Sequence, residues 1–221
     1  MIPVLTLDGP SGVGKGTVAS IVAQKLNWHQ LDSGAIYRAF TIAATDCGIG
    51  IDNLDGLLEL AGKLNLEFKP NAEYAPLSVY LDGVDITTKL RTEKTATLAS
   101  KYAQLAPLRK VLLIKQRLFK KPPGLVADGR DMGTVVFPDA PFKVFLTADP
   151  KERARRRLKQ LQVGGNAGNI LHTLTRVQKR DERDKNRAHS PLKPATDALI
   201  IDTTNLTIDE VVSKVMTIIE V

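Results

Sequence analysis

The spacing of apolar residues along the chain predicts buried strands with helices between them. Short apolar runs bounded by polar or glycine-rich turns predict strands over residues 2–8, 28–31, 124–129, 142–149 and 198–204. Apolar residues at helical spacing predict helices over residues 17–27, 32–48, 53–64, 92–121, 150–191 and 208–220. Such alternation is typical of a parallel, doubly wound α/β sheet, whose ligands bind at the carboxyl ends of its strands.

Individual residues predict where some of these helices begin, end or break. Ser33 is placed to cap the second helix and Gly48 to end it. Pro107 predicts a division of the segment 92–121 into two helices, because proline disrupts a helix interior. Gly164 and Gly165 predict a break in the long basic helix that begins near residue 150.

Residues 65–90 change the pattern to short alternating runs, LEFKP and LSVYLDGVDIT. Asp82 and Gly83 stand between two of these runs and are typical of a tight hairpin turn. The segment therefore predicts a small antiparallel insert in the otherwise parallel architecture.

Composition favours an ordinary globular protein, with 43% hydrophobic and 25% charged residues among 221. No apolar run approaches the roughly 20 residues that span a bilayer.

The amino terminus lacks the basic segment and cleavage site of a signal peptide, so we expect a cytoplasmic location. The single cysteine, Cys47, follows an apolar helical stretch, and we expect a small core residue there.

The positive charge is regional. Residues 151–187 contain twelve basic and four acidic side chains, a net charge of +8, against +7 for the whole chain. This concentration predicts a localised anionic partner: a nucleic acid, nucleotide phosphates or an acidic protein. Aromatic residues are only 5% and none interrupts 153–157 or 176–187, which argues against a stacking platform for single strands.

The segment Gly9–Thr17, GPSGVGKGT, has the G-x-x-x-x-G-K spacing of a phosphate-binding P-loop. An apolar strand precedes it and a helix follows, which is the context that the motif requires. Backbone N–H groups of such a loop face phosphate oxygens, and Lys15 would reach the β- and γ-phosphates. Gly16 takes the place of the usual hydroxyl residue, so Thr17 is the candidate for Mg²⁺, directly or through water.

Two further polar segments follow predicted strands and indicate a second anionic site. DSGAIYR begins at Asp32; Ser33 could contact a sugar or phosphate oxygen, or it could simply cap a helix. DGRDMG begins at Asp128 and places Arg130 between two carboxylates. A guanidinium can bind phosphate through two hydrogen bonds, whereas a carboxylate accepts from an amino group. The pair suits a nucleotide that carries both.

GPSGVGKGT, DSGAIYR, DGRDMGTVVFPDA and RDERDKNRAHSPL resemble, in this order, the motifs of bacterial-type cytidylate kinases, and the resemblance covers essentially the whole chain. It implies a P-loop kinase with a five-stranded sheet and a helical lid. The implied reaction transfers the γ-phosphoryl group of ATP to CMP or dCMP with Mg²⁺ as cofactor. The implied partners are these nucleotides, with no nucleic acid and no membrane, and the protein would be a monomer.

The resemblance also implies one kinase domain in three regions: a core of about 1–34, 105–150 and 190–221, a monophosphate-binding region of 35–104 and a lid of 151–189. The implied catalytic residues are Lys15, Asp128, Arg130 and Arg157. The implied ATP-binding residues are Gly9, Pro10, Ser11, Gly12, Val13, Gly14, Lys15, Gly16, Thr17, Arg153, Arg156 and Arg157. The implied CMP-binding residues are Ser33, Tyr37, Arg38, Ser100, Arg109, Arg130, Asp131, Arg180, Asp184 and Arg187.

Helical spacing adds expectations for the basic segment. Arg153 and Arg156, with Arg157 beside them, share one face of a helix. This face could belong to a closing lid or could be an ordinary solvated surface. Farther along, the spacing of Arg180, Asp184 and Arg187 places all three on one side, and Asp181 could pair with Lys185 on another.

Other functions remain open at this point. The alternatives are a P-loop kinase that acts on another nucleoside monophosphate or on a small hydroxylated acceptor, and a nucleic-acid-binding NTPase.

Overall fold

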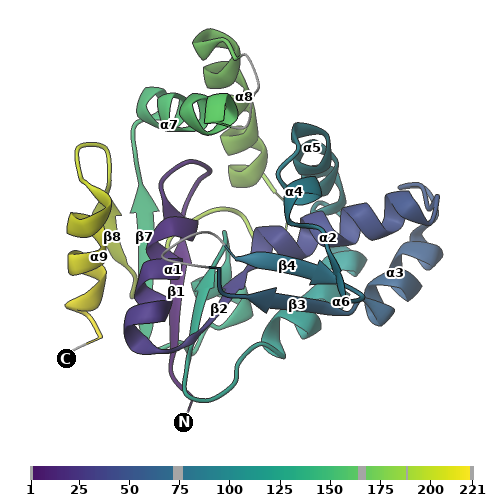
Figure 1. Ribbon diagram of the computed structural model, residues 1–221, viewed down its shortest axis with the longest axis horizontal. Coiled ribbons are helices and arrows are strands. Elements are labelled where there is room, and N and C mark those ends of the chain that lie inside the picture. Colours follow the sequence, from purple (N-terminus) through teal and green to yellow (C-terminus); the bar gives the residue numbers. More distant parts are fainter. Residues whose placement is uncertain (1, 72–76, 164–167, 188, 220–221) are drawn as a thin grey trace.

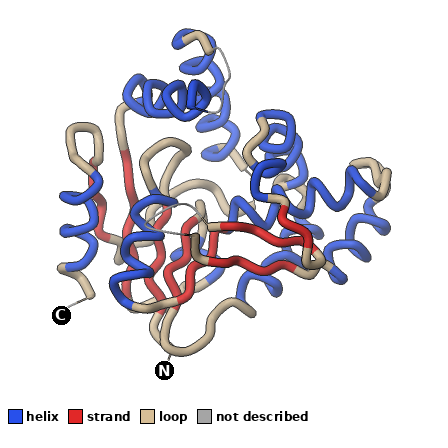
Figure 2. Tube along the Cα trace, in the orientation of Figure 1, coloured by secondary structure: helices blue, strands red, loops and turns tan. Residues whose placement is uncertain are grey.

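A five-stranded parallel sheet forms the centre of the fold (Figures 1 and 2). The computed structural model describes residues 2–71, 77–163, 168–187 and 189–219. The sheet has the order β2-β6-β1-β7-β8, and its strands are β1 (Val4–Asp8), β2 (His29–Asp32), β6 (Leu125–Asp128), β7 (Phe142–Thr147) and β8 (Leu199–Asp202). The parallel sheet predicted from the apolar pattern is confirmed.

Alternate residues of the central strands enter two separate cores, one on each face of the sheet. Leu5 and Leu7 of β1 pack on one face against α1 (Lys15–Leu26) and α9 (Ile208–Met216). Val4, together with Leu125 of β6, packs on the opposite face. The helices of that face are α2 (Ser33–Asp46), α3 (Leu54–Lys63), α5 (Glu93–Tyr102) and α6 (Ala106–Arg117). Because both faces are covered, β1 and β6 carry apolar residues on both of their sides.

The expected antiparallel insert is present as a three-stranded sheet. It consists of β3 (Leu66–Lys69), β4 (Ser78–Leu81) and β5 (Val84–Asp85), and the short helix α4 (Thr87–Leu90) follows it. Asp82 and Gly83 connect β4 to β5 with φ angles of 49° and 80°. Two consecutive positive φ angles match the twist of a two-residue hairpin, which explains the Asp-Gly pair.

Two helices, α7 (Pro150–Val163) and α8 (Ile170–Lys185), pack against each other above the carboxyl end of β7 (Figure 1). We call them the lid helices. The predicted break at Gly164 and Gly165 lies outside the described residues. Across the described ranges, no helix combines the length and the apolar composition of a membrane span.

Two predictions about helix ends and one about the burial of Cys47 were wrong. Asp32, not Ser33, caps α2: its side chain accepts the N–H of Ala35 at 2.9 Å, and Ser33 is the first, buried residue of the helix. Cys47 is exposed, because the buried stripe of α2 ends at Ala44. The long basic helix ends at Lys185, short of residue 191.

Two other expected boundaries hold. Gly48 follows the end of α2 with a φ of 67°, as a helix-terminating glycine should. Pro107 lies in the first turn of α6, and a short turn separates α6 from α5 as expected.

Candidate active site

The P-loop connects the end of β1 to the start of α1, so its position follows directly from the central strand of the sheet. Gly9 has a φ of 145°, and a Cβ there would lie 2.2 Å from the carbonyl oxygen of Leu146. Only glycine fits this approach to β7. Helix α1 begins at Lys15, so the free N–H groups of its first turn lie next to the loop.

Lys15 is buried, and its ammonium donates hydrogen bonds to the carbonyl oxygens of Gly9 and Pro10, both at 2.8 Å. Burial, and then the nearby charge of Arg130, hold the pKa of Lys15 well below its usual range. The carboxylates of Asp128 and Asp8 oppose this shift. The positive charge of Lys15, which lies within the P-loop, is thus partly balanced by these two carboxylates.

Asp128 ends β6 beside the P-loop, and both it and Lys15 are buried. Burial, together with the carboxylate of Asp32, raises the pKa of Asp128 to about 8, although Lys15 opposes the shift. Its Oδ1 has no hydrogen-bond partner among the described residues. A buried carboxylate with a free oxygen is costly to the fold, and such strongly perturbed groups concentrate at functional sites.

Asp8, the last residue of β1, is a second buried carboxylate, and it is not among the residues predicted from the sequence. Its two oxygens accept the backbone N–H groups of Met132 and Gly133, each at 2.8 Å. Burial raises the pKa of Asp8 to about 6, while these two hydrogen bonds oppose the shift. The sequence does contain one indication of its importance, because Asp8 is a charged residue at the end of an apolar strand, directly before the P-loop.

The hydrogen bonds of Asp8 hold a single turn of π-helix, η1 (Met132–Val136), which follows Arg130 and Asp131. At its other end, Arg117 of α6 donates to the carbonyl oxygens of Val136 and Val135, at 2.9 and 3.1 Å. Turns of π-helix occur frequently at functional sites. Here both ends of the turn are fixed, so the segment that carries Arg130 and Asp131 is rigidly placed.

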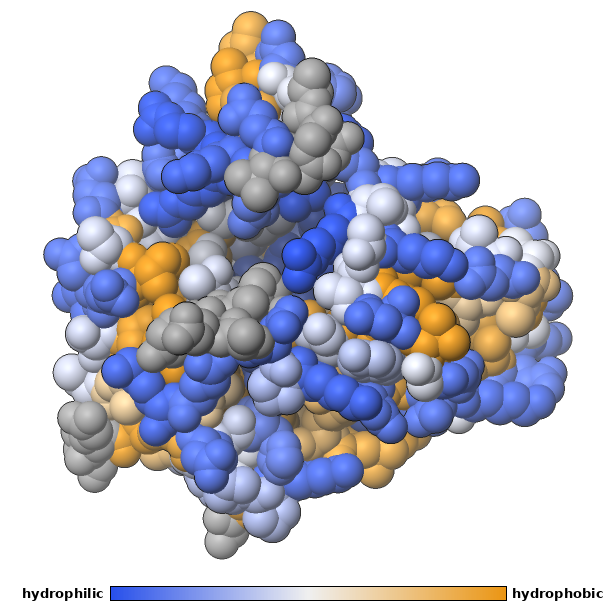
Figure 3. Space-filling model, in the orientation of Figure 1, coloured by the Kyte–Doolittle hydropathy of each residue, from blue (hydrophilic) through white to orange (hydrophobic). Residues whose placement is uncertain are grey.

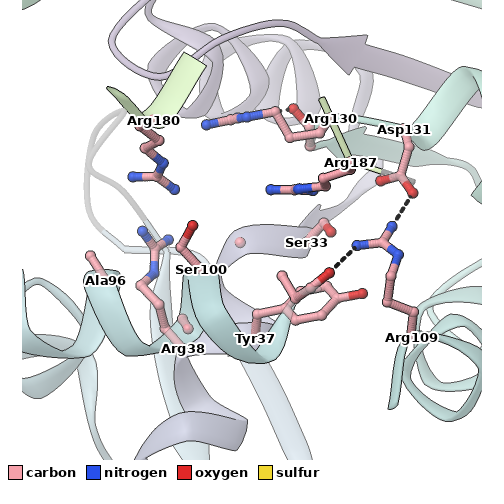
Figure 4. A pocket seen from close by; sticks show the side chains of 14 residues that line it. Ser33, Tyr37, Arg38, Ala96, Ser100, Arg109, Arg130, Asp131, Arg180 and Arg187 are labelled. Atoms are coloured by element: carbon pink, nitrogen blue, oxygen red, sulfur yellow. Dashed lines mark hydrogen bonds and ion pairs between the residues drawn. The ribbon is translucent and has the colours of Figure 1, made fainter. Parts of the chain in front are cut away.

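A pocket lies beneath the lid helices, where the space-filling view shows a hydrophilic hollow (Figure 3). Four guanidinium groups surround one opening (Figure 4); they belong to Arg38, Arg130, Arg180 and Arg187. They come from α2, the loop after β6, α8 and the segment after α8. The structure therefore brings together nine of the ten expected acceptor residues: Ser33, Tyr37, Arg38, Ser100, Arg109, Arg130, Asp131, Arg180 and Arg187.

The pocket has an ion pair at the side opposite Arg180 (Figure 4). Arg109 donates to the carboxylate of Asp131 at 2.5 Å and to the carbonyl oxygen of Ala103 at 3.2 Å. Its guanidinium lies 5.7 Å from the centre of the Tyr37 ring. Burial raises the pKa of Tyr37 to about 12. This side of the pocket offers a carboxylate, a guanidinium and an aromatic ring.

Asp184, the tenth expected residue, lies behind the pocket lining. Its carboxylate accepts from Arg130 at 2.9 Å, forms a closer contact with Arg187 and lies 4.0 Å from Arg180. Burial alone would raise the pKa of Asp184, but the guanidinium groups of Arg130, Arg187 and Arg180 lower it. We expected Arg180, Asp184 and Arg187 to share one side of a single helix. Helix α8 ends at Lys185, however, so Arg187 contacts Asp184 from the segment that follows the helix.

The three clustered arginines of α7 have different partners, although helical spacing placed them on one face. The guanidinium of Arg153 is buried and binds both carboxylate oxygens of Asp181, at 3.0 and 2.6 Å. It also donates to Ala148 and to Ser11 of the P-loop. Asp181 therefore pairs with Arg153 rather than with Lys185 as expected.

The side chains of Arg156 and Arg157 contact parts of the chain other than Asp181. Arg156 donates to the carbonyl oxygen and hydroxyl of Thr203, at 2.6 and 3.1 Å, which fixes α7 to the segment after β8. Arg157 instead points to the opposite wall of the hollow, where its guanidinium lies 3.3 Å from a carboxylate oxygen of Glu93.

The site has a P-loop with a buried lysine on one side and an arginine-lined pocket on the other. Both lie at the carboxyl edge of the sheet, below two lid helices. The fold and this site define a P-loop kinase, a class that transfers a phosphoryl group from a nucleotide to a second bound molecule.

Comparison with known proteins gives the family. The family model for cytidylate kinase matches residues 5–221. The cytidylate kinase of Aeromonas salmonicida (strain A449) is 50% identical over 216 residues, which cover 98% of this chain and 93% of that protein. The cytidylate kinase of Azotobacter vinelandii (strain DJ) is 50% identical over 213 residues, which cover 96% and 93%. This chain belongs to the cytidylate kinase family.

Comparison with solved structures supports the fold alone. The crystal structure of an uncharacterized protein from Eubacterium ventriosum matches with a TM-score of 0.50 at 13% sequence identity. The match covers 100% of this chain and 99% of the other.

Proposed function

We propose that this protein transfers the γ-phosphoryl group of ATP to CMP or dCMP, giving ADP and CDP or dCDP. The observation that carries the proposal is the asymmetry of the acceptor pocket. The pair formed by Asp131 and Arg109 lies at one side and a group of four arginines surrounds the rest. A nucleoside monophosphate has the same asymmetry, with a base at one end and a dianion at the other.

At the base end, Asp131, Arg109 and Ser100 would face cytosine. Cytosine presents one amino donor and two acceptors, N3 and O2, which suit a carboxylate, a guanidinium and a hydroxyl. Uracil carries an oxygen in place of the amino group, and Asp131 would leave that oxygen unmatched. An unmatched buried polar group costs about 1–3 kcal/mol, so the site should prefer cytosine.

At the other end, Arg38, Arg130 and Arg187 would bind the acceptor phosphate. Ser33, Arg180 and Asp184 would lie toward the sugar, and the ring of Tyr37 would form part of the wall. Asp184 also offsets the repulsion among the arginines, because it places a negative charge among three guanidinium groups.

On the donor side, the segment from Gly9 to Thr17 would enclose the phosphates of ATP, with Lys15 at the β- and γ-phosphates. Arg153 and Arg156 serve this site indirectly, because their guanidinium groups bind the P-loop, Asp181 and Thr203. They would fix the lid helix beside the loop. Arg157 would supply the lid charge nearest the transferring group.

The residues fit Mg²⁺ bound mainly through phosphates and water. Asp128 has a free oxygen beside the loop, and Thr17 lies exposed at the start of α1. Within the described ranges there is no cluster of three or more His, Cys, Asp or Glu that could hold a metal by itself. The ion would neutralise charge on the β- and γ-phosphates when bound.

The chemistry needs no general base, because the acceptor phosphate is already an anionic nucleophile. An oxygen of that phosphate attacks the γ-phosphorus, the bond to the β,γ-bridging oxygen breaks, and ADP leaves. Lys15, Arg130 and Arg157 would stabilise the charge that spreads over the transferring group. The lid helices would exclude water and so suppress ATP hydrolysis.

The test is an acceptor panel with ATP and Mg²⁺ that includes CMP, dCMP, UMP, AMP, dTMP and shikimate. We expect transfer to CMP and dCMP at a kcat/KM well above that for the others. Preferred transfer to any other member of the panel would refute the proposal. A monomeric state and a cytoplasmic location, where these nucleotides occur, accompany the proposal.

A further inference from the structure

Helix α5 forms one wall of the acceptor pocket and also faces the lid. Ala96, Ala99 and Ser100 of this helix line the pocket. Glu93 begins the helix, and its spacing from Ala96 and Ser100 places it on the same side. It is the single acidic residue of α5. The first residue of this pocket wall, Glu93, therefore carries a carboxylate.

The lid helices reach this wall at three points. One oxygen of Glu93 lies 3.3 Å from the guanidinium of Arg157 on α7, and its other oxygen makes a closer contact with Arg176 on α8. Arg183 of α8 donates a hydrogen bond to the hydroxyl of Ser100 at 2.9 Å. Among the described residues, Glu93 is the sole carboxylate paired with either Arg157 or Arg176.

Arg157 is also close enough to Arg180, which lines the pocket, to affect its pKa. The pKa of Arg180 is lowered to about 10, first by its enclosure and then by nearby cations that include Arg130 and Arg157. Arg157 is thus repelled by Arg180 and attracted by Glu93. Without that carboxylate, Arg157 and Arg176 would face each other as like charges, which repel at this range.

We propose that Glu93 is a positioning residue that holds Arg157 over the acceptor pocket when the lid helices rest on α5. The inference depends on the role proposed for Arg157 in transfer. It explains how the wall that binds the acceptor can control the placement of a lid arginine. Glu93 lies outside the pocket lining, so it would act through Arg157 rather than by contact with CMP.

The three side chains are each about one-third to one-half exposed, and exposed ion pairs contribute little to folding. The loss of Glu93 should therefore appear in turnover rather than in stability. For Glu93→Gln we expect kcat to fall about fivefold, equivalent to about 1 kcal/mol in the barrier. The KM for CMP should stay within about twofold of the wild-type value, and thermal stability should change little.

Glu59→Gln is the matched control. Glu59 forms an exposed pair with Lys63 on α3, away from the lid, and its loss should leave kcat unchanged. The decisive measurement compares Glu93→Gln in the wild type and in an Arg157→Gln background. If Glu93 acts through Arg157, the second comparison should show almost no further loss.

An equal loss in both backgrounds would show that Glu93 does not act through Arg157 and would overturn the inference. So would an unchanged kcat for Glu93→Gln in an enzyme that phosphorylates CMP. A wild-type enzyme that fails to phosphorylate CMP would instead refute the proposed function, together with the role assigned to Glu93.

Discussion

Replacement of Asp131 by asparagine tests base recognition with the smallest change in shape. The carboxylate is almost fully buried and receives a 2.5 Å hydrogen bond from Arg109, itself largely buried. Asparagine keeps one oxygen for Arg109, so the arginine is not left unpaired. It removes the negative charge and adds an amide N–H₂ that can donate to O4 of uracil but not accept from the amino group of cytosine.

The magnitude follows from the kind of hydrogen bond that is lost. Hydrogen bonds to a charged group contribute about 1.5–3 kcal/mol, which corresponds to about 10- to 150-fold in rate. We expect kcat/KM for CMP to fall by this factor in Asp131→Asn. The value for UMP should stay level or rise, so the CMP/UMP ratio should fall at least tenfold.

The assay is steady-state phosphoryl transfer from ATP to each acceptor, with thermal unfolding to confirm that the variant is folded. An unchanged CMP/UMP ratio in a folded variant would show that Asp131 does not contact the base. A parallel loss for both acceptors would point to a purely structural role in holding Arg109.

Three further changes probe the rest of the site. Arg157→Ala should lower kcat in steady-state assays far more than it raises the KM for CMP; an effect on KM alone would remove Arg157 from the transfer step. Arg153→Ala should lower the unfolding temperature by about 6–20 °C, because breaking a buried ion pair costs about 3–5 kcal/mol, whereas exposed Arg155→Ala should barely change it. Because the pKa of Asp8 is raised in the folded protein, its contribution to stability should be fully present below about pH 4. This contribution should be lost as the pH rises through about 6. The difference in unfolding temperature between the wild type and Asp8→Asn should therefore shrink from pH 4 to pH 7, and a constant difference would contradict the shift.

Much of the architecture follows from local patterns. Apolar runs and glycine-rich turns are sufficient to predict the five parallel strands, the insert and the P-loop, because each depends on residues that are close in sequence. The pairing of the insert strands through Asp82 and Gly83 is the clearest case, since the turn requires two positive φ angles.

The partners of charged side chains could not be predicted in the same way. Helical spacing places Arg153, Arg156 and Arg157 together, yet one binds Asp181, one binds Thr203 and one faces Glu93. These partners come from distant parts of the chain, and a spacing rule contains no information about them. For the same reason Asp8 escaped notice: its importance depends on two N–H groups more than 120 residues away.

That link from β1 to the π-helical turn bears on how acceptor preference could be redesigned. The strand that ends in Asp8 continues directly into the loop proposed to bind the donor, and the Asp8 carboxylate fixes the segment that carries Arg130 and Asp131. Both proposed substrate sites are thus located relative to the same strand of the sheet. Substitutions on the α5 wall could enlarge or reshape the base site while the spacing between donor and acceptor phosphates stays constant. Engineering for new bases should therefore begin at α5 and leave Asp8 and η1 intact.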